Sequence, residues 1–262
     1  MVKAAVPMDV PMDVPMDVIA AKGRPVAMAR TRLLEVDGAL GGLFPAGGLQ
    51  RGSVVEVAGG AAMSLSLALA AGVMPAGSSR WVAAVGFPSI GLVAAAQMGV
   101  PLERLALVPA PGERWAEVVA ALLDGVDLLL LSPPAGLRAS DARRLAARAR
   151  ERGVVLVPVR HQGSGRWPES PDVRMEADSV EWTGLGAGFG YLRHRRVEIA
   201  VEGRRVAGGR RRSAPFWMPG PEGVRPAEAG RPGEAGLPAE VARPAEIAQA
   251  GAGPVLERAA AG

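Results

Sequence analysis

The chain alternates between short, continuously apolar runs and longer segments whose apolar residues recur every three or four positions. A short apolar run is typical of a strand buried on both faces, and the longer period is typical of a helix. Strands and helices that alternate through short connections favour an α/β fold, a doubly wound and mostly parallel sheet with helices on both faces. The pattern predicts strands at 53–58, 80–86, 104–109, 126–131 and 153–159, and helices at 63–73, 89–98, 113–124 and 139–152.

The periodicity changes after Pro158. A polar loop over 160–171 precedes two segments, 173–182 and 189–201, in which apolar and polar residues alternate. This alternation is typical of strands with one solvated face. The glycine-rich stretch GLGAGFG at 184–190 lies between them and indicates the turn of a C-terminal antiparallel hairpin.

Both ends of the chain have compositions that disfavour a packed core. Residues 7–18 read PMDV three times, and proline at every fourth position blocks helices and sheet ladders, so 1–30 is expected to be a disordered leader. Residues 209–262 are rich in proline, alanine, glycine and glutamate without apolar periodicity, which predicts a disordered tail. The folded unit is therefore expected over 31–208.

The composition of the chain argues against some kinds of site and for others. The chain has no cysteine and only two histidines, so a metal site is not expected. Its net charge of +4 comes from arginine and is weak support for nucleic-acid binding. Two uncharged runs, 57–79 and 81–102, are interrupted by glycine and proline, which favours buried α/β core over membrane spans. No basic-then-apolar signal opens the chain, so a cytoplasmic location is expected.

A glycine turn follows the first predicted strand and precedes an alanine- and leucine-rich helix. Strand, glycine turn and helix is the layout of a phosphate-binding loop, in which backbone N–H groups hold the phosphates and a lysine reaches their oxygens. The pattern G-x-x-x-x-G-K-[ST] cannot be fitted from Gly59 or Gly60, because neither a second glycine nor a lysine follows. The loop is predicted to keep the frame of a nucleotide site without its chemistry.

Several segments together resemble RecA-type recombinases in order and spacing. They are RGSVVEVAGG, VAAVGFP, LERLALVPAPGERWAEVVAALLDGVDLLLLS, the helix at 139–152 and LVPV. The chain is most similar to the RecA-like mutasome accessory proteins called ImuA, particularly the actinobacterial branch, where WTGLGAGFGYLRHRRVEIAVEGRR resembles the closing hairpin. The resemblance covers about residues 33–208 and implies a RecA-like domain over 31–208.

Compared with that family, this chain lacks the residues of ATP hydrolysis. Ser64 and Leu65 stand where the loop lysine and hydroxyl are expected, and Ser132 stands in place of the aspartate that orders Mg²⁺. Phe87-Pro88 replaces the water-activating glutamate, and Arg160 replaces the γ-phosphate-sensing glutamine. Phosphoryl transfer depends on those groups, so no enzymatic activity and no cofactor are expected.

The nucleotide loop is thus interpreted as vestigial. Two readings stay open: weak phosphate binding through backbone N–H groups, or an empty scaffold. Its residues are Gly59, Gly60, Ser64, Ser66 and Ser132.

Arginines gather around the last hairpin and its exit. They could neutralise DNA phosphates, contact a protein partner, or form a solvated edge strand. The segment SAPFWMP at 213–219 could dock on a partner or fold back on its own domain. The candidate contact residues are Arg193, Arg195, Arg196, Arg204, Arg205, Arg210, Arg211, Arg212, Phe216 and Trp217.

The resemblance implies a non-enzymatic assembly factor of a DNA-damage-induced translesion synthesis complex, the mutasome of the SOS response. It would bridge the inactive Y-family polymerase homologue ImuB and an error-prone C-family polymerase, with DNA contacted directly or indirectly. Two alternatives stay open: an active RecA-like ATPase that binds single-stranded DNA, and a SulA-like inhibitor of cell division.

Overall fold

The computed structural model describes residues 32–185, 190–203, 210–220 and 223–227. Its centre is a four-stranded parallel sheet in the order β5-β4-β6-β7. The strands are β4 (Val82–Val85), β5 (Leu105–Val108), β6 (Leu128–Leu131) and β7 (Val155–Pro158). The predicted parallel α/β arrangement is confirmed, with strands somewhat shorter than expected.

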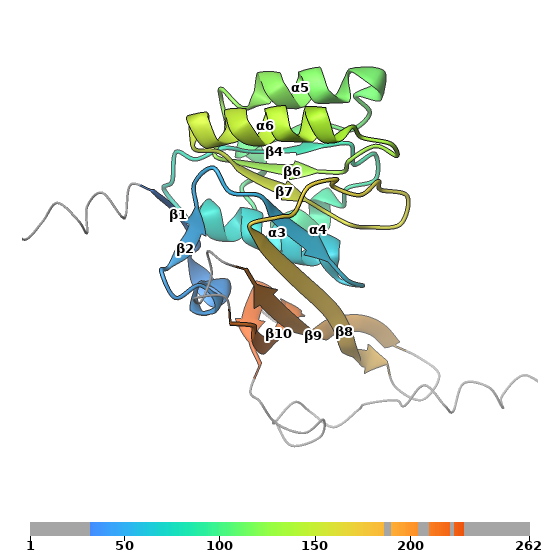
Figure 1. Ribbon diagram of the computed structural model, residues 1–262. Helices are drawn as coiled ribbons and strands as arrows, with labels where there is room; N and C mark the ends of the chain where they lie inside the picture. The colour runs from blue at the N-terminus through green and yellow to red at the C-terminus, as the bar shows by residue number, and fades with distance from the viewer. Residues whose placement is uncertain (1–31, 186–189, 204–209, 221–222, 228–262) are drawn as a thin grey trace, which may run out of the picture.

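Helices cover both faces of this sheet, as predicted (Figure 1). Alternate residues of one strand therefore enter different cores: Leu128 and Leu130 pack on one side, Leu129 and Leu131 on the other. Burial on both faces explains why these strands are apolar throughout. One face carries α3 (Ala62–Val73) and α4 (Leu92–Gln97); the other carries α5 (Trp115–Leu122) and α6 (Ala139–Arg152). Short 3-10 turns, η2 (Leu102–Arg104) and η3 (Gly112–Arg114), precede β5 and α5.

The strand β3 (Val55–Ala58) joins the parallel sheet to a second, five-stranded sheet. Parallel bridges Val54↔Leu156 and Val57↔Val159 place it beside β7, and it pairs in parallel with β8 (Val173–Leu185). Counted along the chain from β3, the parallel strands lie in the order third, second, fourth, fifth, first, sixth. This order differs from the classical dinucleotide-binding order 3-2-1-4-5-6.

The C-terminal hairpin is also confirmed, because β8 and β9 (Gly190–Glu202) pair antiparallel. The sheet continues beyond it with β10 (Arg212–Gly220) and β11 (Gly223–Pro226). The prediction of a disordered tail from residue 209 is therefore wrong for 212–220 and 223–226, and the folded unit does not end at 208. Phe216 and Met218 alternate with outward-facing residues and are buried against Val197 and its neighbours, a pattern hidden by the prolines and glycines around them. The leader 1–30 and the tail after residue 227 lie outside the described residues.

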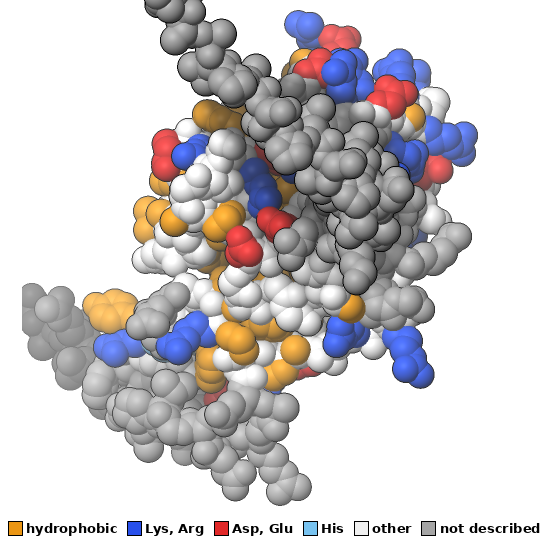
Figure 2. Space-filling model, turned by 90° about the vertical axis from the view of Figure 1, so that its left-hand side faces the viewer, with side chains coloured by type: hydrophobic (Ala, Val, Ile, Leu, Met, Phe, Trp, Pro, Cys, Tyr) orange, Lys and Arg blue, Asp and Glu red, His pale blue; other side chains and the backbone are white. Residues whose placement is uncertain are grey.

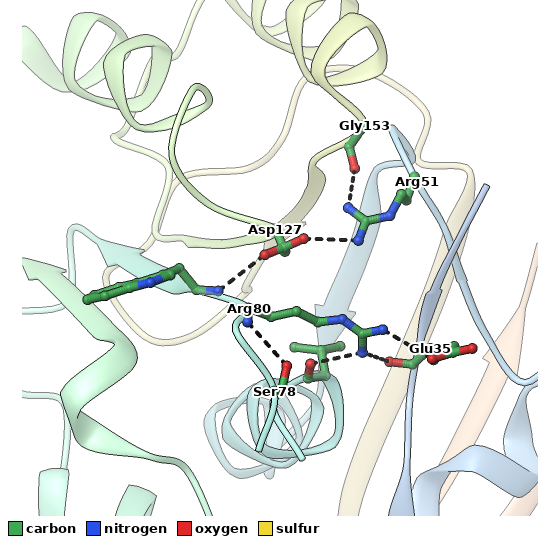
Figure 3. A network of polar contacts seen from close by, with 8 residues as sticks. Glu35, Arg51, Ser78, Arg80, Asp127 and Gly153 are labelled. Atoms are coloured by element: carbon green, nitrogen blue, oxygen red, sulfur yellow. Dashed lines mark hydrogen bonds and ion pairs between the residues drawn. The ribbon is translucent and has the colours of Figure 1, made fainter. Parts of the chain in front are cut away.

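The N-terminal part forms a small antiparallel ribbon that is tied to the amino edge of the parallel sheet. The ribbon consists of β1 (Leu33–Glu35) and β2 (Gly48–Gln50), joined through the 3-10 helix η1 (Gly38–Leu43). Figure 3 shows the polar ties: Arg80 reaches the Glu35 carboxylate at 3.1 Å, and Arg51 reaches that of Asp127 at 2.9 Å. This network holds the ribbon at the edge opposite the glycine turn.

No helix among the described residues is long and apolar enough to cross a membrane.

Candidate functional site

The carboxyl ends of the parallel strands meet at one edge of the sheet, where open α/β folds place their ligand sites. The glycine turn after β3 lies at this edge, and so do Ser132 after β6 and Arg160 after β7. The edge therefore brings together the positions at which a nucleotide site was expected, and each can be tested by its contacts.

The backbone N–H groups of the glycine turn are hydrogen-bonded to residues of β8. The N–H of Ala61 donates to the carbonyl of Ala177 at 2.8 Å, and the N–H of Gly60 donates to the Asp178 carboxylate at 3.2 Å. Gly59 has φ +100°, and a Cβ added there would lie 2.3 Å from the Ala177 carbonyl oxygen. Two N–H groups expected to hold phosphate are thus bonded to the protein itself, one of them to an anionic side chain.

A side chain of β9, Arg195, contacts the first turn of α3. The Arg195 guanidinium donates from Nη2 to Ser64 Oγ and from Nε to the carbonyl of Met218 at 3.0 Å. It also lies over the Trp182 ring, 5.0 Å from the ring centroid, and the residue is only 8% exposed. Burial lowers the pKa of this guanidinium from its ordinary value. A cation therefore lies beside Ser64, the position at which a loop lysine is expected. This cation comes from the hairpin and is fixed by intramolecular contacts.

The two serines of α3 differ. Ser64 accepts from Arg195, whereas the buried Ser66 donates to the carbonyl of Ala62 at 2.8 Å, one turn earlier in the helix. Of the residues grouped as a vestigial loop, the structure brings Gly59, Gly60 and Ser64 together and directs Ser66 into the helix.

Ser132 has an unexpected partner. Its Oγ lies 2.9 Å from His161 Nε2, and His161 Nδ1 lies 2.9 Å from the carbonyl of Gln162. A carbonyl only accepts, so Nδ1 carries a proton in this arrangement, and in the neutral imidazole Nε2 accepts from the serine. Phe87 lies beside this imidazole, with ring centroids 5.4 Å apart. Sequence analysis missed His161, whose only signal was its position three residues after β7.

The Ser132–His161 pair resembles part of a nucleophile–base arrangement, but its surroundings do not support that chemistry. The histidine is oriented by a backbone carbonyl instead of a carboxylate. The N–H of Ser132 is bonded to Val85, and the two residues that follow, Pro133 and Pro134, have no N–H with which to stabilise an oxyanion. The pair joins the ends of β6 and β7. Among the described residues, no group of three histidine, aspartate or glutamate side chains could hold a metal ion.

The arginines of α6 differ from those of the hairpin and its exit. Four of the five arginines of α6 are paired with carboxylates: Arg143 with Glu169, Arg144 with Asp141, and Arg148 and Arg152 with Asp124. Figure 2 shows this mixture of charges along the upper part of the molecule, where α5 and α6 lie. These paired arginines are therefore a largely neutralised, solvated helix face.

The arginines of the hairpin and its exit are less neutralised. Arg193, Arg210 and Arg212 are exposed, Arg196 is half-buried, and Arg211 lies 3.4 Å from the Glu176 carboxylate. Arg204 and Arg205 lie outside the described residues. The structure thus divides the predicted contact arginines: Arg195 is enclosed, whereas Arg193 remains open to solvent.

The segment 213–219 folds back on its own domain. Phe216 is 3% exposed and belongs to the core beneath β10, whereas Trp217 is half-buried on the other face of the strand. The prediction that Phe216 contacts a partner does not fit this burial. Of the two alternatives for the segment, folding back on the domain is the one observed.

Comparison with known proteins matches the α/β core. The family model described as the MT3502 N-terminal domain matches residues 42–169, from within η1 to just past the buried Trp167. The uncharacterized protein Rv3395c of Mycobacterium tuberculosis is 46% identical over 121 residues, covering 45% of this chain and 57% of that protein. A mycobacterial relative agrees with the actinobacterial character of the resemblance, while neither description names ImuA or an activity. The chain spans little more than half the length of this relative.

Proposed function

We propose that the protein is a non-enzymatic, RecA-like assembly factor of a mutasome, bridging ImuB and an error-prone C-family polymerase. The absence of enzymatic activity is proposed because the glycine turn is already bonded within the protein. Asp178 and Arg195 of the hairpin take the places that a phosphate and its counter-cation would have. A RecA-like relationship is supported by the parallel strand order, by helices on both faces and by the glycine turn at the carboxyl edge.

The residues at the edge argue against ATP turnover on chemical grounds. An ATPase of this class stabilises the transferring phosphoryl group with a lysine and a carboxylate-held Mg²⁺, and it orients the attacking water. Here the lysine position is Ser64, bonded to Arg195, and the metal position is Ser132, bonded to His161. An ATP phosphate would also have to displace the Asp178 carboxylate from Gly60.

The purified full chain is expected to bind no Mg-ATP by calorimetry and to release no phosphate, with or without single-stranded DNA. Both readouts follow from a turn in which the N–H groups of Gly60 and Ala61 already have acceptors on β8. Tight ATP binding that is lost in Ser64→Ala would overturn the proposal and favour an active RecA-like ATPase. The Ser66→Ala variant is the matched control, because its hydroxyl points into the same helix but away from the turn.

An assembly role also needs a surface for protein partners, and α4 offers one. The stretch 86–102 has no charged residue, yet Leu92, Val93, Ala94 and Ala96 are exposed, Val93 to 74%. Exposed apolar patches of this kind mark protein contacts. We therefore expect the Y-family homologue to contact α4 through an apolar face of its own.

Val93→Glu is expected to reduce capture of the purified Y-family homologue at least about tenfold, because it places a charge in an apolar contact. The measurement is capture on immobilised full chain, with Leu192→Glu as control, since Leu192 is 52% exposed on the distant hairpin. Equal capture by both variants would remove α4 from the interface. Failure of the unaltered chain to capture either polymerase-type partner, together with capture of the cell-division GTPase, would favour the SulA-like alternative.

A further inference from the structure

The β8–β9 hairpin continues beyond the hydrophobic core at its outer end. Along β9, Val201, Ile199 and Val197 are buried, and Arg195 continues the same face at the first turn of α3. Beyond His194 the pairing is irregular, because Gly184 alone of β8 lies opposite residues 191–193 of β9. Tyr191 is 81% exposed, and Arg193 is exposed as well.

The neighbouring strand completes this surface. Trp182 of β8 lies directly opposite Arg195 and is exposed on one side, while the guanidinium lies over its ring. Next along β8, Gly184 leaves room for Arg193: an added Cβ would lie 2.9 Å from Arg193 Cγ. The same Cβ would lie 2.2 Å from the Tyr191 carbonyl oxygen, so Tyr191 and Arg193 both lie beside Gly184, two residues from Trp182. Trp182, Tyr191 and Arg193 are here called the hairpin-end surface, and Arg195 is fixed behind Trp182.

The charge around the hairpin-end surface is positive and not neutralised by the described residues. Over 181–184 and 191–196 the chain carries Arg193, Arg195 and Arg196 against Glu181. Within the part of the chain that the structure describes, no carboxylate lies within ion-pair distance of these arginines, in contrast to the paired arginines of α6. Exposed arginines without carboxylate partners favour a polyanion.

We propose that the hairpin-end surface binds single-stranded nucleic acid. Bases stack on the Tyr191 and Trp182 rings, and the backbone phosphates contact Arg193. Arg195 acts as a positioning residue, because its bonds to Ser64 and Met218 hold it against the inner side of Trp182. A single strand fits better than a duplex because its bases offer free faces for stacking. Binding of a protein at the same surface is the alternative, and the partner-capture measurement below separates it from binding of nucleic acid.

The test uses the full chain and a fluorescently labelled oligothymidylate of about 16 nucleotides, the upper range of single-domain binding sites. Binding is followed by anisotropy over a series of salt concentrations. Tyr191→Ala is expected to weaken binding about 5- to 150-fold, the range found for loss of one stacked base. Arg193→Ala is expected to reduce the slope of log affinity against log salt by about 0.7, the value for one phosphate contact of a single strand.

Two control variants change exposed residues that are not part of the hairpin-end surface. Leu192→Ala changes an exposed apolar residue next to Tyr191 that offers neither a ring nor a charge, and Arg144→Ala removes an α6 arginine that is paired with Asp141. Both are expected to bind like the unaltered chain. Circular dichroism and thermal unfolding establish that Tyr191→Ala is folded, as its exposure leads us to expect.

Three results would overturn the proposal. One is absence of salt-dependent binding by the unaltered chain, and another is equal weakening by Leu192→Ala and Tyr191→Ala. The third is normal oligothymidylate binding by Tyr191→Ala with loss of Y-family partner capture, which would make the surface a protein contact. Because Val93 variants test the assembly role separately, failure of one proposal is distinguishable from failure of the other.

Discussion

Phe216→Ala is expected to lower the free energy of unfolding by about 3–5 kcal/mol, the cost of emptying a large buried aromatic site. Phe216 is 3% exposed and packs in the core that β9 and α3 share, although it lies in a stretch with the composition of a disordered tail. The measurement is urea unfolding of the full chain followed by circular dichroism. The expected size follows from β10 being an integral strand of the second sheet.

Trp217→Ala is the matched control for this experiment. Trp217 is the next residue and a larger aromatic, yet it lies on the other face of β10 and is half-buried. Its substitution is expected to cost about 1 kcal/mol or less, as at partly exposed positions. Equal and small losses for the two variants would contradict the placement of β10 in the folded core.

Gly59→Ala is expected to destabilise the protein by about 2–4 kcal/mol, with no nucleotide present. The residue has φ +100°, which strains any other side chain, and the new Cβ would meet the Ala177 carbonyl at 2.3 Å. Either β8 must move away from β3 or the turn must change shape. Thermal and urea unfolding of the full chain measure the loss.

Gly60→Ala separates a structural role of the turn from a phosphate-binding one. No atom lies within 4 Å of a Cβ added at Gly60, so this variant is expected to unfold within about 0.5 kcal/mol of the unaltered chain. If the turn served phosphate binding, both glycine substitutions would disturb ligand binding while stability changed little. A large loss of stability in Gly59→Ala alone supports the interpretation of the turn as an empty scaffold.

The core was predictable because its signals are local. Continuously apolar strands and the amphipathic pattern of α6 placed the elements, and α6 begins and ends as predicted, at Ala139 and Arg152. Arg138 precedes its first turn, and Gly153 ends it in the left-handed conformation that glycine adopts readily. The hairpin followed equally from its alternating residues.

The site was less predictable because its contacts are long-range. Asp178 and Arg195 reach the glycine turn from positions 118 and 131 residues along the chain, so no local pattern marks them as its occupants. The pairing of Ser132 with His161 likewise depends on β6 and β7 being neighbours. Composition misled at β10, where three alternating core residues, Ala214, Phe216 and Met218, were set among residues typical of disorder.

The position of β10 between β9 and β11 also decides where the protein can be divided. A chain that stopped at residue 208 would keep every element that the core pattern predicts, yet it would leave the backbone of β9 from Arg196 to Val201 without its partner strand. An open edge of that length, backed by Val197 and Ile199 and no longer covered by Phe216, invites pairing with other copies and aggregation. Expression and fusion should therefore place the boundary after Ala227.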